Sequence, residues 1–231
     1  LIGKRGMSPN FSFENLLELA ERESGAYGLA DEGLQARVRS LVDWVNARGP
    51  YTPDQVQRMR HQVKRVLANR LRIALDRRQF PAIADEKIVR PLIVVGLPRS
   101  GTTLLHSLLA EDPEANAPRA WHSLVPSPPP GAGPVPAGRI AQAQRAVDRF
   151  LDFVPGLRPL HPYWDKGADS LIEDEGLFTL DFRNAYPTLL YEIPTLDVMV
   201  ELVGADVGAT YRFHREVLQH LQWNTGRTRW A

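Results

Sequence analysis

The feature that most constrains the fold of this chain is an apolar run followed by a loop between two glycines. Residues 91–95 read Pro-Leu-Ile-Val-Val, and residues 96–103 read Gly-Leu-Pro-Arg-Ser-Gly-Thr-Thr. A short apolar run rich in β-branched residues that ends in a turn is typical of a buried strand in a parallel sheet. We therefore predict a strand over 92–95. The apolar residues that follow have helical spacing and predict a helix from Thr102 that packs on the sheet through Leu104, Leu105, Leu108 and Leu109.

The loop has the composition of an anion-binding site. Gly96 and Gly101 permit backbone angles that a Cβ would forbid, so successive amide N–H groups can curl around one anion. That anion would lie at the N-terminus of the following helix, where unsatisfied N–H groups and the helix dipole favour negative charge. Arg99 adds a forked, permanently charged donor that suits a phosphate or sulfate group. Hydroxyl donors come from Ser100, Thr102 and Thr103.

The same loop differs at one position from the pattern G-x-x-x-x-G-K-[ST] of nucleotide-hydrolysing proteins. That pattern places a lysine directly after the second glycine, where it reaches the β- and γ-phosphates. This chain has Thr102 there, and its nearest cation is Arg99 inside the loop. The sequence therefore favours a phosphate-binding loop with a donor other than ATP or GTP. An ordinary strand–turn–helix connection is the alternative interpretation.

Residues 97–106, Leu-Pro-Arg-Ser-Gly-Thr-Thr-Leu-Leu-His, resemble the 5′-phosphosulfate-binding loop of the sulfotransferase family. The resemblance is closest to a bacterial branch whose loop has Pro-Arg-[ST]-Gly-Thr-Thr. It extends from about residue 11 to the C-terminus through less specific landmarks, which are Asp112-Pro113, Pro118-Arg-Ala-Trp121, Tyr211-Arg-Phe-His214 and Leu218-Gln-His-Leu-Gln-Trp223.

The resemblance implies a donor, 3′-phosphoadenosine 5′-phosphosulfate (PAPS), and transfer of its sulfuryl group to a hydroxyl or amine of a small-molecule acceptor. In-line transfer of this kind needs charge stabilisation on the transferring group and on the departing phosphate. Arg99 and the loop amides could supply both, without a metal ion. The resemblance thus gives Arg99 a catalytic role and assigns donor binding to Pro98, Arg99, Ser100, Gly101, Thr102 and Thr103.

A sulfotransferase also needs a base, because a neutral hydroxyl is a weak nucleophile. Relatives of this branch tend to have glutamate directly after the tryptophan that corresponds to Trp121, where this chain has His122. His122 is therefore the candidate base, with a surface or capping histidine as the alternative. His161 is the second candidate, and His106 is expected to face the packing of the loop helix. The acidic run 173–175 is expected to open a helix.

Aromatic residues are candidates for an apolar acceptor pocket, although aromatic residues at such positions are more often core. They are Trp121, Tyr163, Trp164, Phe178 and Phe182.

The end of the sequence leads to a further expectation. Members of the family carry a second motif, with an arginine and a serine that bind the 3′-phosphate of the donor, on a later strand and helix. This sequence stops at Arg227-Thr-Arg-Trp-Ala231, where that strand would begin, and it starts at Leu1. We therefore expect a truncated chain with an incomplete sheet, an exposed edge at 92–95 and weakened PAPS binding.

The composition indicates which kinds of partner and which compartment to expect. The formal net charge of +1 gives no general attraction to nucleic acid or to an anionic membrane. The sequence has no cysteine, which fits a reducing cytoplasm. It also has no apolar run near the ~20 residues that span a bilayer. We therefore expect a cytoplasmic protein without a membrane span; the composition does not address its oligomeric state.

We expect an α/β fold of the P-loop type, with a parallel sheet and helices on both faces. The expected domains are a helical N-terminal region, 1–86, and a partial sulfotransferase-like domain, 87–231. Helix starts are predicted at Ser12 and at Thr52-Pro53 with Gln55, which has the pattern of a reciprocal cap. Later helices are predicted from 140, over 170–184 and over 207–223, with an exposed proline-rich loop at 126–136.

Basic residues along the helix predicted to start at Thr52-Pro53 could form a surface for an acidic partner or for the adenosine phosphates, but a solvated helix face is the simpler interpretation. Two other functional classes stay open on the sequence alone. One is a P-loop kinase or NTPase, which would need a lysine in the loop and an acidic magnesium ligand. The other is a helical interaction module without enzymatic activity.

Overall fold

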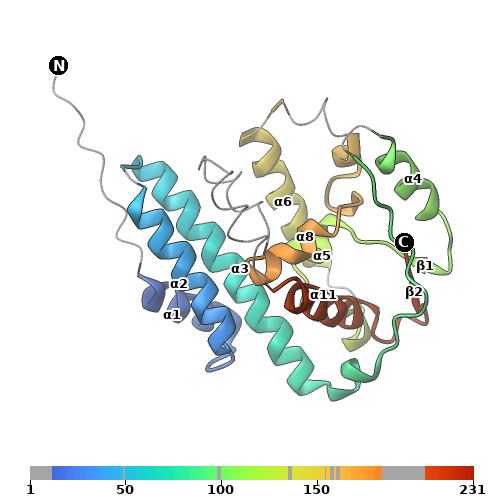
Figure 1. Ribbon diagram of the computed structural model, residues 1–231, viewed down its shortest axis with the longest axis horizontal. Helices are drawn as coiled ribbons and strands as arrows, with labels where there is room; N and C mark the ends of the chain where they lie inside the picture. Colours follow the sequence, from blue (N-terminus) through green and yellow to red (C-terminus); the bar gives the residue numbers. More distant parts are fainter. Residues whose placement is uncertain are drawn as a thin grey trace. The chain divides into compact units, whose positions relative to one another are not determined.

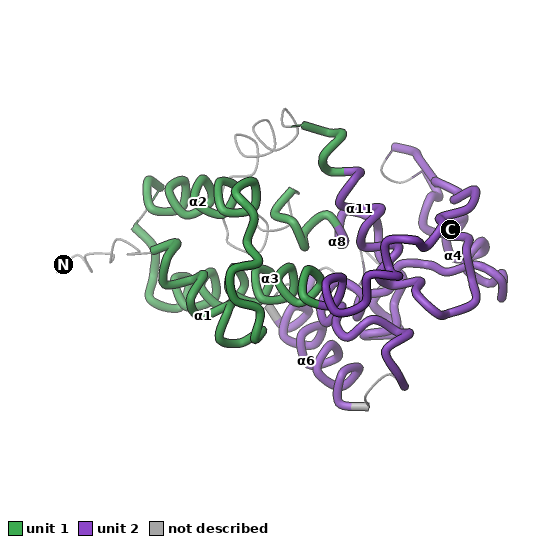
Figure 2. The backbone as a smooth tube through the Cα atoms, turned by 90° about the horizontal axis from the view of Figure 1, so that it is seen from below, with its two compact units in different colours: residues 1–75, 178–210 green, residues 76–177, 211–231 purple. Residues whose placement is uncertain are grey.

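The computed structural model describes residues 12–48, 50–97, 100–134, 137–153, 155–156, 159, 162–183 and 206–231. The chain forms two compact units that are not consecutive in sequence (Figure 2). Unit 1 consists of residues 1–75 and 178–210, and unit 2 of residues 76–177 and 211–231. Each unit therefore joins an early part of the chain to a later one, whereas the sequence suggested two successive domains that meet at residue 86.

Unit 1 is built on α1 (Phe13–Ser24), α2 (Glu32–Ala47) and most of α3 (Pro53–Gln79) (Figure 1). The predicted caps are present. Ser12 Oγ accepts a hydrogen bond from Asn15 N (3.3 Å). At the start of α3, Thr52 N donates to Gln55 Oε1 (2.8 Å) and Gln55 N donates to Thr52 Oγ1 (3.3 Å). These reciprocal bonds satisfy two backbone donors that a helix start otherwise leaves unpaired, so the helical N-terminal region is confirmed.

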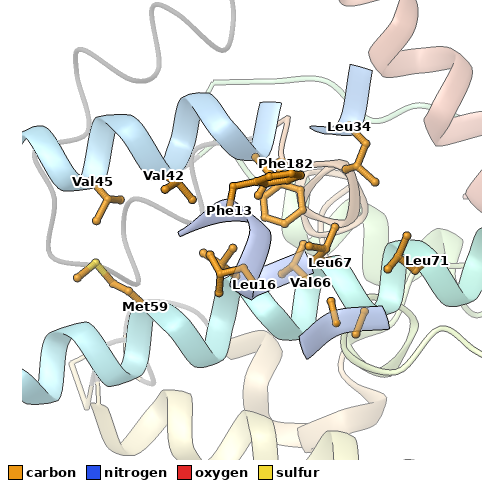
Figure 3. Close-up of a cluster of buried hydrophobic side chains, with 14 of the residues drawn as sticks. Phe13, Leu16, Leu34, Val42, Val45, Met59, Val66, Leu67, Leu71 and Phe182 are labelled. Carbon is orange, nitrogen blue, oxygen red and sulfur yellow. The ribbon is translucent and has the colours of Figure 1, made fainter. Parts of the chain in front are cut away.

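The core of unit 1 is formed where the apolar stripes of its helices meet (Figure 3). Stripe residues recur at helical spacing, as in Val38, Val42 and Val45 of α2. Phe182 comes from the second part of the unit and is buried in the same cluster as Phe13. Other members of the cluster are Leu16, Leu34, Met59, Val63, Val66, Leu67 and Leu71.

A buried carboxylate holds this second part of unit 1 in place. Asp181 lies at the end of η4 (Thr179–Asp181) and its side chain is 3% exposed. Arg37 Nη2 and Arg70 Nε lie 2.7 and 2.9 Å from Asp181 Oδ1, and Arg183 Nε donates to Oδ2 (2.7 Å). Arg37 Nε also donates to the Asp181 carbonyl (2.9 Å). Charge-assisted bonds of this kind stabilise a carboxylate that would be costly to bury alone.

The other elements belong wholly or mainly to unit 2 (Figure 2). In chain order they are η1 (Pro81–Asp85), α4 (Thr102–Leu109), β1 (Ala115–Asn116), α5 (Ala120–Leu124), η2 (Pro130–Ala132), α6 (Ala137–Phe153), η3 (Pro162–Asp169), α8 (Glu175–Phe178), α11 (Val207–Gln222) and β2 (Arg229–Trp230). The helix predicted over 207–223 and a strand at the end of the chain are both present.

The sheet of the described residues is small and parallel. It has two strands, β1 and β2, with Ala115 opposite Arg229 and Asn116 opposite Trp230. The run predicted as a strand, 92–95, is not one: it is extended, but regular pairing is limited to its first residue. Leu92 N donates to Trp230 O (2.9 Å), and Val89 N donates to Thr228 O (2.9 Å). This segment therefore runs parallel to β2 but does not extend the sheet as a third strand. The predicted parallel sheet is confirmed, but it is smaller than the apolar run suggested.

The leucines of α4 do not pack as predicted. No residue of α4 is buried, and Leu104, Leu105 and Leu108 are exposed by 66, 49 and 63%. The apolar run before the loop is exposed too, with Val95 at 87%. Both observations have one cause, which is that two strands of two residues offer too little surface for the helix to cover. Because 92–95 is not a strand, the exposed strand edge expected there does not apply; what is observed is exposure of its side chains.

The helix predicted over 170–184 is also wrong in extent. Residues 170–172 are extended and pair with the segment after β1: Ala120 N donates to Ser170 O (2.8 Å) and Ile172 N to Pro118 O (3.0 Å). Among the described residues of this range, helical structure is confined to α8 and η4. Among the described residues, no helix combines the length and the apolar character that a bilayer crossing requires.

Candidate functional site

The loop that the sequence predicts to bind an anion leads directly into α4. Gly101 is the N-cap residue of α4 and has φ +91°, a left-handed conformation that glycine adopts without strain. No side chain caps this helix start. A helix start presents backbone N–H groups and the positive end of the helix dipole, which favour a nearby anion. Gly101 and Ser100 are exposed, whereas Thr102 and Thr103 are half-buried.

Gly96 closes the loop from the other side. A Cβ on Gly96 would lie 2.7 Å from Ser100 Oγ and 2.7 Å from Thr102 Cγ2, closer than side-chain contacts allow. Ser100 N donates to Leu97 O (3.2 Å), which turns the chain within the loop. A side chain at position 96 would therefore displace the side chains of Ser100 and Thr102. Pro98 and Arg99, the two remaining predicted loop residues, lie outside the described residues.

Trp121 and His122 stand on α5, the helix that follows β1. His122 is buried, and its Nδ1 accepts a hydrogen bond from Arg119 N (3.0 Å). Burial, with a contribution from the positive charges of Arg139 and Arg119, lowers the pKa of His122 to about 3. A ring nitrogen that already accepts a backbone N–H has no lone pair to offer a substrate proton. This placement favours the capping role that the sequence left as the alternative.

A buried polar cluster lies next to these residues in unit 2. The Arg139 guanidinium stands 4.7 Å from the centre of the Trp121 ring and donates to the carbonyls of Val125 (2.7 Å) and Pro126. His220 of α11 also contacts the Pro126 carbonyl, through Nε2 (3.2 Å). The cluster therefore fixes the start of the proline-rich segment, whose residues Pro126 and Pro129 are buried rather than exposed as predicted.

His220 is uncharged at neutral pH. Its Nε2 lies 3.7 Å from Asp76 Oδ2, a distance at which an ion pair would form if the ring were protonated. Burial, and then the charges of Arg139 and Arg77, lower the pKa of His220 from 6.5 to about 4. The contact with Asp76 is therefore one between a neutral ring and a carboxylate. Burial likewise lowers the pKa of Arg139 to about 10, which still leaves its guanidinium charged at pH 7.

The other predicted residues are dispersed. Trp164 is half-buried and packs on Phe150, with ring centres 5.7 Å apart. Phe178 and Phe182 belong to unit 1, and Phe182 is part of its core, so it does not line an acceptor pocket. His161 and the side chain of Tyr163 lie outside the described residues.

In unit 2, a histidine and a carboxylate that the sequence did not predict to interact lie close together. His214 Nε2 of α11 is 3.1 Å from Asp174 Oδ1, in the turn before α8. The two residues are 40 positions apart, so neither spacing nor a motif could have predicted the contact. His106, half-buried on α4, is within electrostatic reach of the same turn: burial lowers its pKa, and the charges of Asp174 and Glu173 oppose that shift.

Within the described part of the chain, no three histidine, aspartate or glutamate side chains gather in a group that could hold a metal. A bridging magnesium ion, as in ATP chemistry, would need acidic ligands near the loop. The glycine-lined turn and the uncapped start of α4 instead offer backbone N–H groups, which suit a phosphate or sulfate oxygen.

Comparison with known proteins points to sulfotransferases. The model of the sulfotransferase family matches residues 91–196, which include the loop, α4 and α5. No curated protein matches the chain significantly by sequence.

Two solved structures share the fold. Sulfotransferase STF9 from Mycobacterium avium superposes with a TM-score of 0.76 and 25% identity, over 99% of this chain and 57% of that one. Sulfotransferase STF1 from Mycobacterium tuberculosis H37Rv gives a TM-score of 0.73 and 22% identity, over 97% of this chain and 61% of that one. The chain thus spans about three fifths of the length of these two proteins. The family model matches a segment of less than half of the chain, and the two structures share its fold, so the chain is similar to sulfotransferases.

Proposed function

We propose that this chain carries the 5′-phosphosulfate-binding part of a PAPS-dependent sulfotransferase that acts on a hydroxyl or amine of a small molecule. The observation that carries the proposal is the loop itself. Gly96 and Gly101 shape a turn that ends at the uncapped start of α4, and this turn lies inside the segment that matches the sulfotransferase family. The rival P-loop kinase lacks both its lysine, replaced by Thr102, and a cluster of acidic ligands among the described residues.

The roles of the loop residues follow from their chemistry. Backbone N–H groups from Gly101 onward would hold the oxygens of the phosphosulfate, helped by the positive end of the α4 dipole. The hydroxyls of Ser100, Thr102 and Thr103 add neutral donors. Arg99 would stabilise the charge that builds up on the sulfuryl group and on the departing phosphate. PAPS, when bound, supplies the sulfuryl group and leaves as adenosine 3′,5′-bisphosphate.

Calorimetry with adenosine 3′,5′-bisphosphate and with ATP·Mg²⁺ tests the donor class. We expect the bisphosphate to bind and ATP·Mg²⁺ not to bind. Arg99→Ala should abolish bisphosphate binding, whereas Arg145→Ala, at an exposed position of α6, should leave it unchanged. Unchanged bisphosphate affinity in Arg99→Ala would contradict the proposed role of Arg99. Tighter binding of ATP·Mg²⁺ than of the bisphosphate would favour a nucleotide-hydrolysing protein.

A second variant tests the shape of the loop rather than its charge. In Gly96→Ala the new Cβ would push Ser100 and Thr102 aside, so we expect bisphosphate affinity to fall by about tenfold or more, equivalent to about 1.4 kcal/mol. Gly138→Ala in α6 is the matched control, because no atom lies within 4 Å of its added Cβ. Equal affinity in the two variants would show that the curled loop does not hold the ligand.

A further inference from the structure

A buried carboxamide ties the segment that enters the loop to β2. Gln222 is the last residue of α11 and is 1% exposed. Its Nε2 donates to Glu86 Oε2 (2.7 Å) and to the Lys87 carbonyl (3.0 Å), and its Oε1 accepts from the Trp230 indole N–H (3.0 Å). Gln222 therefore joins residues 86–87, which lead toward the loop, to a tryptophan of β2.

The chemistry of the three partners suits a carboxamide at position 222. A carboxylate and a carbonyl accept hydrogen bonds, and an indole N–H donates one, so the partners fix the orientation of the amide. Glutamate at this position would keep the acceptor for Trp230 but would set a second carboxylate against Glu86. An apolar side chain would remove all three hydrogen bonds from a buried position, which is costly for the polar groups left there.

This connection sets the register of the chain that runs into the loop. Leu92 N donates to Trp230 O (2.9 Å), and Leu92 stands four positions before Gly96. A slip of one residue along β2 would move Gly96 by about 3.3 Å and turn the intervening side chains to the opposite face. Gln222 opposes such a slip, because it holds residues 86–87 and Trp230 at the same time.

The helix on the other side of the loop is bonded to the same end of β2. His106 stands one turn after Thr102 on α4 and is half-buried. Burial lowers the pKa of His106, and a hydrogen bond with the backbone of Ala231, the residue after Trp230, opposes that shift. The flank before the loop is thus bonded to Trp230 and the flank after it to Ala231. The end of β2 therefore sets the separation between the two flanks.

We propose that Gln222 is a positioning residue for the sulfuryl donor. By holding Trp230 and residues 86–87 together, it sets the spacing of the two flanks of the loop and hence the shape that residues 96–103 present to the phosphosulfate. Gln222 acts in this role through the backbone of the loop and not by touching the ligand. This inference rests on the proposed function.

Calorimetric titration of the whole chain with adenosine 3′,5′-bisphosphate tests this role. Gln222→Met keeps the length of the side chain and removes its three hydrogen bonds, so we expect the affinity to fall by about tenfold. Hydrogen exchange of the Leu92 amide, measured by NMR, should also become at least about tenfold faster, because this amide donates to Trp230 O.

Gln219→Met is the matched control. Gln219 is a second buried glutamine of α11, and its Nε2 donates to the carbonyls of Ala84 (3.1 Å) and Glu86 (2.9 Å) rather than to β2. This variant removes the same type of hydrogen bond from the same helix. We expect it to change the bisphosphate affinity and the exchange of the Leu92 amide by less than about threefold.

A rescue experiment separates positioning from a general loss of packing. Gln222→Glu sets two carboxylates against each other and should weaken bisphosphate binding by about tenfold or more. Adding Glu86→Gln restores a hydrogen-bond donor to this contact, so the double variant should regain an affinity within about threefold of that of the unmodified chain. No recovery in the double variant, or equal losses in Gln222→Met and Gln219→Met, overturns the role of Gln222.

The unmodified chain distinguishes this inference from the proposed function. If it binds the bisphosphate and Gln222→Met binds equally well, the positioning role falls and the donor site stands. If the unmodified chain does not bind the bisphosphate, the proposed function and the role of Gln222 both fall.

Discussion

Two histidines of unit 2, His122 and His220, are buried, and burial lowers the pKa of both. His122 accepts a backbone hydrogen bond at the start of α5, and His220 contacts the Pro126 carbonyl from α11. Charging either ring would place a cation in a buried site that already contains the Arg139 guanidinium. Their neutrality therefore contributes to the stability of this cluster near pH 7.

Stability should consequently fall as the pH is lowered from about 6.5 toward 4. The folded-state pKa of His220 is about 4, below its ordinary 6.5, so in this range the unfolded chain binds a proton that the folded chain does not. Each such histidine lowers the free energy of unfolding by about 1.4 kcal/mol per pH unit. Urea unfolding of His220→Gln between pH 6.5 and 4.5 should show a slope reduced by about that amount. An unchanged slope would contradict the assignment, whatever the variant's absolute stability.

How well the site could be predicted differs from residue to residue. Gly96, Gly101 and the hydroxyls are neighbours in sequence, so their spacing alone predicted the loop and the helix that starts at Thr102. His214 and Asp174 meet only because α11 packs next to the turn before α8, and Arg37 and Asp181 are 144 positions apart. Its position directly after Trp121 made His122 a candidate base, but the sequence does not reveal that its side chain is buried.

Among the elements, helix starts were predictable and the strand was not. Caps depend on residues three positions apart, so Ser12 and the pair of Thr52 and Gln55 gave the starts of α1 and α3 directly. A strand depends on a partner elsewhere in the chain. The run 92–95 has the composition of a central strand, yet only Leu92 bonds to β2, and its apolar side chains remain exposed.

The turn around η4 depends on a single charge. Asp181 is 3% exposed and lies within 3 Å of nitrogen atoms from Arg37, Arg70 and Arg183. Removing the carboxylate would leave three partly buried guanidiniums to repel one another around an empty acceptor site. Breaking a buried ion pair by deleting one member typically costs about 3–5 kcal/mol.

We therefore expect Asp181→Ala to lower the free energy of unfolding of unit 1 by an amount in that range, measured by urea denaturation. Glu18→Gln is the control, since Glu18 and Arg22 form an exposed pair 3.9 Å apart and such pairs contribute less than about 1 kcal/mol. A similar small effect in both variants would mean that the arginines find other acceptors once Asp181 is removed.

At the scale of the whole molecule, apolar exposure is concentrated in one stretch of sequence. Of the large apolar side chains that are exposed in the described residues, most lie between residues 89 and 108. They flank the anion-binding loop on both sides, and the most exposed are Ile93, Val95, Leu97, Leu104 and Leu108. Soluble monomers rarely leave large apolar patches uncovered, so this concentration of exposed apolar side chains favours association.

The 231-residue chain should therefore self-associate through this stretch. The double variant Ile93→Lys, Val95→Lys adds two charges at side chains that are 69 and 87% exposed, so it should weaken association without loss of packing. Tyr27→Lys, Val207→Lys is the matched control, because these side chains are 64 and 55% exposed but lie outside the stretch. Sedimentation velocity over a range of concentrations measures the difference. We expect the first variant to shift the association midpoint by about tenfold, as a 1.4 kcal/mol loss would. Equal sedimentation of the two variants would show that association does not depend on the apolar side chains between residues 89 and 108.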